Sequence, residues 1–367
     1  MNALRLEWGP ALKEVRSHRS GRYGVHVVDD VTTALAAAIG PDDALLVTTP
    51  TVYELYGAII ARELELDVLV VEVDEADKGL HQVERITREM FRRGMSRRGV
   101  VVALGGGICS DLVTCAAAWF RRGIRYIPVP TTLVGQIDAG IGVKGAVNVA
   151  GKKSGMGTYH LPQTVLIHPP YLKTLGRQYI SEGLSEIVKM GIIRDARLFE
   201  LLDRHAEALL DSALASPAQV GREVIDRAIC AMLEELEPNL FENRSWERLV
   251  DFGHSFSPAL ESAIDFGMHH GHAVAVDMAI CGVLAHHHGM LEGDALTRML
   301  GLLRRMELPL WHDALSHELF EVALDDCSRH RGGVPNIVLP TSMGTARVCG
   351  DRALFSDAFS IAQGVLA

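Results

Sequence analysis

Three separated segments of the 367-residue chain carry residue types that bind transition metals. Glu186 lies in a predicted helix, three residues before Lys189, and the histidines His254 and His270 each precede another predicted helix. One carboxylate and two imidazoles are the usual protein ligands of a catalytic zinc that keeps a coordination position open for substrate. A lone histidine or a Glu–Lys pair is more often structural, so it is the combination, with the apolar neighbours of Glu186, that favours a metal site.

A second candidate site follows a strand predicted over residues 100–104. The triplet Gly105–Gly107 stands where this strand passes into a helix of small residues, so the backbone could approach a pyrophosphate at the helix N-terminus. Thr131 and Thr132 offer hydroxyls at the end of a neighbouring strand, where open parallel sheets bind ligands. The motif is not a full G-x-G-x-x-G, because Ser110 takes the place of the last glycine. A tight turn without a ligand stays an alternative.

Lysines gather in a glycine-rich connection over residues 135–157. This connection contains Asp138, Lys144, Lys152 and Lys153, and we expect it to form a flexible loop. Clustered ammonium groups can hold a phosphate or hydroxyl groups, although a solvated loop has the same composition.

Composition limits the classes of protein to which the chain can belong. Its length favours two domains, and 48% hydrophobic with 22% charged residues is typical of globular proteins. The net charge of -10 argues against a nucleic-acid ligand. Charges and glycines interrupt every apolar run well before about 20 residues, so we expect no membrane span. Six scattered cysteines without a C-x-x-C pair favour the reducing cytoplasm.

The hydrophobic pattern divides the chain near Pro162 to Pro170. Before that point strands alternate with helices, which predicts a Rossmann-like parallel sheet, and after it apolar residues recur at helical spacing. The predicted fold class is therefore α/β plus all-α, with an α/β domain over 1–165 that carries the candidate nucleotide site and a mainly helical domain over 166–367 that carries the candidate metal site; the family resemblance described next makes these the NAD-binding domain and the metal- and substrate-binding domain. The predicted strands are 24–28, 44–48, 67–72, 100–104 and 125–129, the helices 51–64, 80–93, 172–215, 217–236, 256–264, 273–287 and 293–306, and a small hairpin 336–339 with 346–349.

These motifs, in this order from about Glu75 to Gly344, resemble the sugar phosphate cyclases, the superfamily of 3-dehydroquinate synthase. The resemblance implies a dehydroquinate synthase-like fold, NAD as cofactor, and Zn²⁺, with Co²⁺ as an alternative. It aligns Glu186, His254 and His270 with the zinc ligands. The residues that it aligns with NAD contacts are Glu75, Lys78, Gly105, Gly106, Gly107, Asp111, Thr131, Thr132 and Thr174. Those that it aligns with the substrate site are Lys189, Lys144, Asp138 and Lys152.

Within the superfamily, Asp251-Phe-Gly-His254, Ser257-Pro258 and His330-Arg-Gly-Gly333 look like the 2-epi-5-epi-valiolone synthases. We expect Asp251 and His330 to recognise substrate hydroxyl groups. Arg122 matches an arginine that, in this family, reaches the substrate phosphate of the partner subunit, which implies a homodimer.

The resemblance implies a redox-neutral reaction. Sedoheptulose 7-phosphate would be oxidised transiently by NAD, lose phosphate, be reduced again and close to a C7 cyclitol by an intramolecular aldol step. His272 and Lys153 stand where the family has a carboxylate and an asparagine, so the epimer 2-epi-valiolone is an alternative product. A 3-dehydroquinate synthase and a metal-dependent polyol dehydrogenase are the alternative functions.

Overall fold

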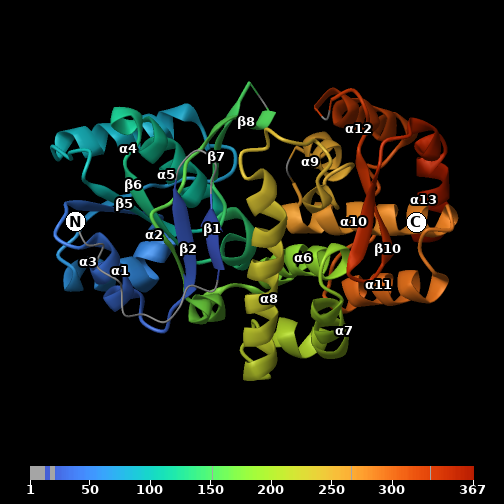
Figure 1. The fold of residues 1–367 in the computed structure, drawn as a ribbon, viewed down its shortest axis with the longest axis horizontal. Helices are drawn as coiled ribbons and strands as arrows, with labels where there is room; N and C mark the ends of the chain where they lie inside the picture. The colour runs from blue at the N-terminus through green and yellow to red at the C-terminus, as the bar shows by residue number, and fades with distance from the viewer. Residues whose placement is uncertain (1–12, 17–20, 151, 266, 331) are drawn as a thin grey trace. The chain divides into compact units, whose positions relative to one another are not determined.

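The computed structural model describes residues 13–16, 21–150, 152–265, 267–330 and 332–367 (Figure 1). The chain forms two compact units, Met1–Leu172 and Lys173–Ala367, whereas the hydrophobic pattern predicts a boundary at 165/166. None of the helices in the described ranges combines the length and the apolar character that crossing a membrane requires.

The first unit is built on a parallel sheet, as the alternating pattern predicts. Because the strand predicted over 24–28 belongs to a separate small sheet, this parallel sheet contains four of the five predicted strands. Its strands lie in the order β4-β3-β5-β6. The chain runs outward from β3 to β4 and then crosses back to β5, so the direction of winding reverses between β3 and β5. Open sheets bind ligands at the carboxyl ends of the strands at this reversal. The strand bounds are β3 (Ala44–Thr48), β4 (Asp67–Val70), β5 (Val100–Gly105) and β6 (Arg125–Pro130).

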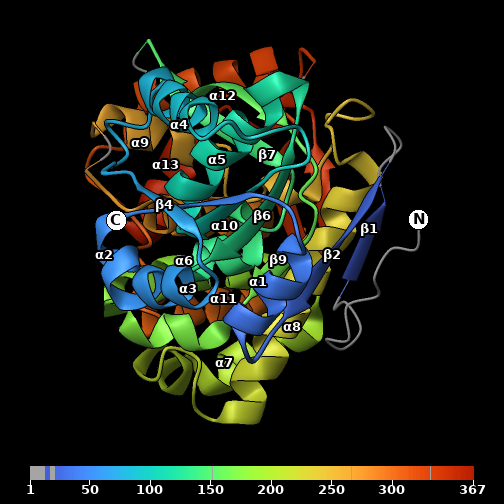
Figure 2. The same ribbon diagram turned by 90° about the vertical axis from the view of Figure 1, so that its left-hand side faces the viewer.

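Helices cover both faces of this sheet (Figure 2). Successive side chains of β5 point to opposite faces: Val101 and Ala103 pack with α4 and α5, and Val102 and Leu104 pack with α1 and α3. A strand that is buried on both faces is apolar throughout, which explains the run of valines. The helices are α1 (Val31–Ile39), α3 (Ala58–Glu63), α4 (Leu80–Arg92) and α5 (Gly107–Trp119), and α2 (Pro50–Val52) joins α3 through a π-helical turn.

The predicted flexible loop over residues 135–157 is wrong. It begins with a π-helical turn, Gly135–Ala139, and continues as an antiparallel hairpin of β7 (Lys144–Val149) and β8 (Lys152–Tyr159). Its glycines serve packing: a Cβ on Gly145 would lie 2.6 Å from Cβ of Thr114 in α5. A second small sheet contains β1 (Lys13–Arg16), β2 (Arg22–Val27) and β9 (Val165–Ile167).

The second unit is mainly helical, as predicted, and is organised around α6 and α10, which are buried along most of their length (Figure 1). In α10 the residues 273–285 are nearly all apolar, and a helix that is apolar all round belongs in the interior. The helix predicted over 172–215 is two helices, because Asp195 caps the second by accepting a hydrogen bond from N of Leu198 at 3.0 Å. The helices are α6 (Arg177–Ile193), α7 (Ala196–Asp211), α8 (Ala218–Leu236), α9 (Ser257–Ala263), α10 (His270–His287), α11 (Gly293–Arg305), α12 (His317–His330) and α13 (Ala358–Leu366), and the predicted hairpin is β10 (Ile337–Ser342) with β11 (Thr345–Cys349).

Candidate active site

Glu186, His254 and His270 converge in the second unit. Glu186 lies in the middle of α6, His254 in the turn before α9, and His270 is the first residue of α10. Nε2 of His254 lies 3.7 Å from Oε1 of Glu186, and Nε2 of His270 lies 3.6 Å from the same oxygen. One ligand atom from each of the three residues lies within 4.8 Å of the other two.

Hydrogen bonds on the far side of each imidazole fix the direction in which Nε2 points. Nδ1 of His254 is 3.1 Å from the carbonyl oxygen of Phe252 and Nδ1 of His270 is 2.8 Å from Oε1 of Glu261. Proteins orient metal-binding histidines in this way, because a hydrogen bond from Nδ1 leaves the lone pair of Nε2 for the ion. Glu261, which is 4% exposed, is a further residue of the site that is not among the predicted ones.

The carboxylate of Glu186 fits a cation. Glu186 is fully buried, and its Oε1 accepts no hydrogen bond from a described residue. Nζ of Lys189 lies 2.5 Å from Oε2, so Oε1 is the oxygen that faces the two histidines. A buried carboxylate oxygen without a hydrogen bond is costly, and an ion at this position removes the cost. The donor set of one carboxylate oxygen and two imidazole nitrogens matches Zn²⁺ or Co²⁺.

Asp251 and His330 stay predictions as substrate-recognition residues. Both carboxylate oxygens of Asp251 bind the guanidinium of Arg248, at 2.6 and 3.2 Å, and its carbonyl oxygen accepts a hydrogen bond from N of His254 at 3.0 Å. Asp251 therefore also shapes the turn that carries His254. The backbone of His330 ends α12, and its side chain lies outside the described part of the structure.

In the first unit, Gly105 and Gly106 have the tight packing expected of a nucleotide-binding turn. A Cβ on Gly105 would lie 2.6 Å from Cβ of Cys109, and one on Gly106 would lie 2.9 Å from Cγ2 of Thr132. Gly106 caps α5 without a side chain, so the first backbone N–H groups of the helix face whatever lies at its N-terminus. N of Thr131 donates to the carbonyl oxygen of Gly105 at 2.9 Å and fixes the neighbouring strand end.

The loop after β4 is held by two sets of contacts. Nζ of Lys78, which is 4% exposed, lies 2.5 Å from Oδ2 of Asp111. Burial raises the pKa of Asp111, and Lys78 opposes that rise. Nδ2 of Asn148 in β7 donates to the carbonyl oxygen and to Oε1 of Glu75, at 2.7 and 3.0 Å. Asn148 is not among the predicted site residues, although the loop that it holds carries two of the predicted NAD contacts.

The remaining predicted site residues are more scattered. Asp138 is half-buried in the π-helical turn, and Lys144 and Lys152 are exposed on the hairpin. Thr174 belongs to the second unit, whereas the other predicted NAD contacts belong to the first. Arg122 is exposed, and its backbone has a φ of 70°.

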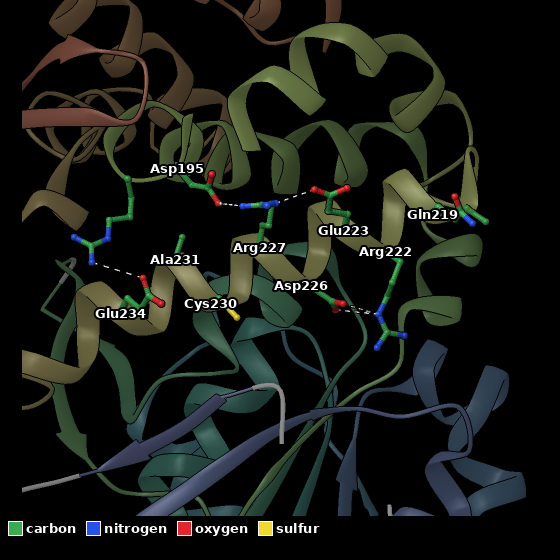
Figure 3. Close-up of a pocket in the computed structure, with 11 residues that line it drawn as sticks. Asp195, Gln219, Arg222, Glu223, Asp226, Arg227, Cys230, Ala231 and Glu234 are labelled. Atoms are coloured by element: carbon green, nitrogen blue, oxygen red, sulfur yellow. Dashed lines mark hydrogen bonds and ion pairs between the residues drawn. The ribbon is translucent and has the colours of Figure 1, made fainter. Parts of the chain in front are cut away.

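A groove along α8 is a separate feature of the second unit (Figure 3). Its arginines already bind carboxylates: Arg227 contacts Asp195 at 2.9 Å and Glu223 at 3.0 Å, and Arg222 contacts Asp226 at 2.9 Å. Because these cations are already paired, the groove is a poor candidate for a phosphate site.

Comparison with known proteins decides the family. The model for the N-terminal part of 3-dehydroquinate synthase matches residues 68–182, and the model for its C-terminal part matches residues 183–328. The chain belongs to the 3-dehydroquinate synthase family. The predicted resemblance to this superfamily is thus confirmed.

Individual members of the family resemble the chain over nearly its whole length. A 2-epi-5-epi-valiolone synthase from Streptomyces hygroscopicus subsp. jinggangensis (strain 5008) is 39% identical over 93% of this chain and 85% of the relative. A 2-epi-valiolone synthase from Stigmatella aurantiaca (strain DW4/3-1) is 31% identical over 95% of this chain and 90% of the relative. The solved structure of ValA, the 2-epi-5-epi-valiolone synthase from the same Streptomyces strain with NAD⁺ and Zn²⁺ bound, is 37% identical, covers 96% of this chain and 98% of its own, and superposes with a TM-score of 0.89.

Proposed function

We propose that this family member is a 2-epi-5-epi-valiolone synthase, which converts sedoheptulose 7-phosphate to a C7 cyclitol and releases phosphate. The observation that carries the proposal is the convergence of Glu186, His254 and His270 in a chain that is 39% identical to a synthase of that name. The epimer 2-epi-valiolone is the less favoured product, because the relative that makes it is 31% identical.

The second unit contributes the proposed metal ligands and Lys189, Asp251 and His330, whereas Asp138, Lys144 and Lys152 belong to the first unit. We propose that Glu186, His254 and His270 hold Zn²⁺, which when bound supplies a Lewis acid for substrate hydroxyl groups. Lys189 lies beside Glu186 and would stabilise negative charge that develops on the substrate oxygens. Lys144, Lys152 and Asp138 would bind the sugar phosphate, with Asp251 and His330 as contacts to its hydroxyl groups.

The first unit is suited to keeping its cofactor. NAD, when bound, accepts a hydride and returns it within one turnover. A redox-neutral cycle fails if NADH leaves, so the loop that carries Glu75 and Lys78 must stay in place. The buried Lys78–Asp111 pair and the hydrogen bonds from Asn148 hold that loop and support this proposal. Gly105, Gly106 and Gly107 would bind the pyrophosphate, and Thr131, Thr132 and Thr174 would complete the NAD contacts.

We also propose that the protein is a cytoplasmic homodimer in which Arg122 reaches the substrate of the partner subunit. Arg121 and Arg122 have φ values of 49° and 70°, a left-handed conformation that costs non-glycine residues energy and is found at functional positions. Phe91 and Trp119 are 53% and 38% exposed, and the guanidinium of Arg121 lies over the ring of Phe91. An exposed aromatic group beside a strained arginine turn is a suitable surface for a second copy.

Turnover of defined substrates tests the proposed reaction. The protein is incubated with sedoheptulose 7-phosphate, NAD⁺ and Zn²⁺, and phosphate release, NADH absorbance and the NMR spectrum of the product are measured. We expect equimolar phosphate and 2-epi-5-epi-valiolone with no accumulation of NADH, and no turnover by His254→Ala. Steady growth of NADH absorbance would indicate a polyol dehydrogenase instead. Phosphate release from the substrate of 3-dehydroquinate synthase alone would indicate that enzyme.

Complementation between subunits tests the role of Arg122. Arg122→Ala and Lys189→Met should each be inactive, while a randomly assorted mixture should recover about a quarter of the wild-type activity, because half of the dimers contain one intact site. A mixture that stays inactive, although mass spectrometry detects mixed dimers, contradicts the shared site.

A further inference from the structure

Asp277 is a fully buried carboxylate inside an otherwise apolar stretch of α10, seven residues after His270. Its Oδ2 accepts hydrogen bonds from three consecutive backbone N–H groups at 2.7, 2.5 and 2.8 Å. Its Oδ1 accepts a bond from the thiol of Cys281 at 3.3 Å. The three backbone donors are Ser255, Phe256 and Ser257, the residues that directly follow His254.

The backbone on both sides of His254 therefore lies against α10. After His254, the backbone donates hydrogen bonds to the carboxylate of Asp277. Before it, Gly253 has a φ of 77°, and a Cβ at this position would lie 2.8 Å from Cγ1 of Val274 and 3.2 Å from its carbonyl oxygen. Burial raises the pKa of Asp277, and the hydrogen bonds from the three backbone donors and from Cys281 oppose that rise. Because all three N–H groups must point at one oxygen, the hydrogen bonds hold residues 255–257 in one position relative to α10.

A second contact joins α10 and α9, but here the acid belongs to α9 and the histidine to α10. Glu261 in α9 binds the imidazole of His270 in α10, while Asp277 in α10 binds the start of the segment that leads into α9. Each of the two elements thus fixes the histidine, or the backbone beside the histidine, that the other carries. Neither Glu261 nor Asp277 belongs to the three-residue cluster itself.

We propose that Asp277 is a positioning residue of the metal site, which sets the place of the His254 imidazole relative to His270 and Glu186. The proposal rests on the proposed role of His254 as a metal ligand, and not on the identity of the sugar substrate. It also assigns a role to the one acid in the segment 273–285, which is otherwise built of apolar residues and glycine.

Asp277→Asn is the variant that separates positioning from folding. The amide oxygen of asparagine can still accept from the backbone, and its volume is nearly that of aspartate, so the protein should fold. An amide oxygen is a weaker acceptor than a carboxylate oxygen, so the three hydrogen bonds weaken and His254 gains freedom. Val283→Ala is the matched control: it removes buried volume from the same helix, away from the segment after His254, and lowers stability without changing the attachment.

The experiment measures Co²⁺ binding by the intact protein and the visible absorption of the bound ion, which reports coordination geometry. For Asp277→Asn we expect Co²⁺ affinity to fall by about 10- to 100-fold, the loss typical of residues that orient metal ligands, and the absorption bands to shift. For Val283→Ala we expect wild-type affinity and bands despite a lower melting temperature. His254→Ala should lose the bands.

Wild-type affinity and an unchanged spectrum in Asp277→Asn would overturn the proposal, and so would an equal loss of affinity in Val283→Ala. The outcome is independent of catalysis: a wild-type protein that binds Co²⁺ through His254 but does not cyclise sedoheptulose 7-phosphate refutes the proposed function and leaves the role of Asp277 standing. If the wild-type protein binds no Co²⁺, or binds it without needing His254, both the proposed function and the role of Asp277 are refuted.

Discussion

Lys189→Met tests whether the positive charge of Lys189 balances the buried carboxylate of Glu186, and whether a bound metal ion can balance the same carboxylate. Their side chains are 0% and 2% exposed, and the two charged atoms lie 2.5 Å apart. Removing one partner of a buried ion pair leaves an uncompensated charge and typically costs about 3–5 kcal/mol. For a cooperative unit of about 150–250 residues each kcal/mol lowers the melting temperature by about 2–4 °C, so we expect the metal-free variant to melt roughly 6–20 °C below the wild type.

Thermal unfolding with and without Zn²⁺ is the assay. The ion supplies positive charge to Glu186 in place of Lys189, so the loss of melting temperature should be clearly smaller in the loaded variant. The double variant Glu186→Gln/Lys189→Met is the second control. It removes both charges, so it should be more stable than Lys189→Met alone.

Two results would refute this reasoning. One is an equal loss of melting temperature in the metal-free and the loaded variant. The other is a double variant whose loss equals the sum of the two single losses, because additivity means that the two side chains are not coupled.

Three further predictions concern residues around the two sites. Glu261→Gln should weaken Zn²⁺ binding by about 10- to 100-fold, measured by competition with a chelator, because the hydrogen bond that orients His270 is weakened; unchanged affinity would contradict this orienting role. Asn148→Ala should weaken NAD⁺ binding about tenfold in calorimetry, since two hydrogen bonds that hold Glu75 are lost, and an unaltered affinity would show that the loop is held by other contacts. Burial raises the pKa of Cys109 and Cys115 to about 12, so both thiols should stay protonated and resist alkylation at mildly alkaline pH until the protein is unfolded, and labelling of either in the native state would count against this burial.

The three residues of the candidate metal site could be predicted because their types carry the information. A carboxylate and two imidazoles in apolar or glycine-rich contexts are rare enough to be noticed, and the order of the motifs along the chain resembles one family. The parallel sheet was equally accessible, since strands such as Val100–Gly105 are apolar on both faces.

The residues that were missed act through contacts between distant segments. Nothing in the spacing of Glu261 and His270 says that one orients the other, and the partners of Asp277 are backbone N–H groups that carry no sequence signal. The one available hint was the position of Asp277 as a lone acid in an apolar helix. The hairpin of β7 and β8 was mistaken for a loop because glycines that serve packing, such as Gly145, obscure its alternating pattern.

Anomalous diffraction at the zinc absorption edge, from crystals of the Zn²⁺-loaded protein, tests the central claim most directly. The account predicts one strong peak, with Nε2 of His254, Nε2 of His270 and an oxygen of Glu186 each about 2.0–2.2 Å away, as in zinc sites with an open position. A peak bound by other residues, or no ordered ion at these three side chains, would contradict it.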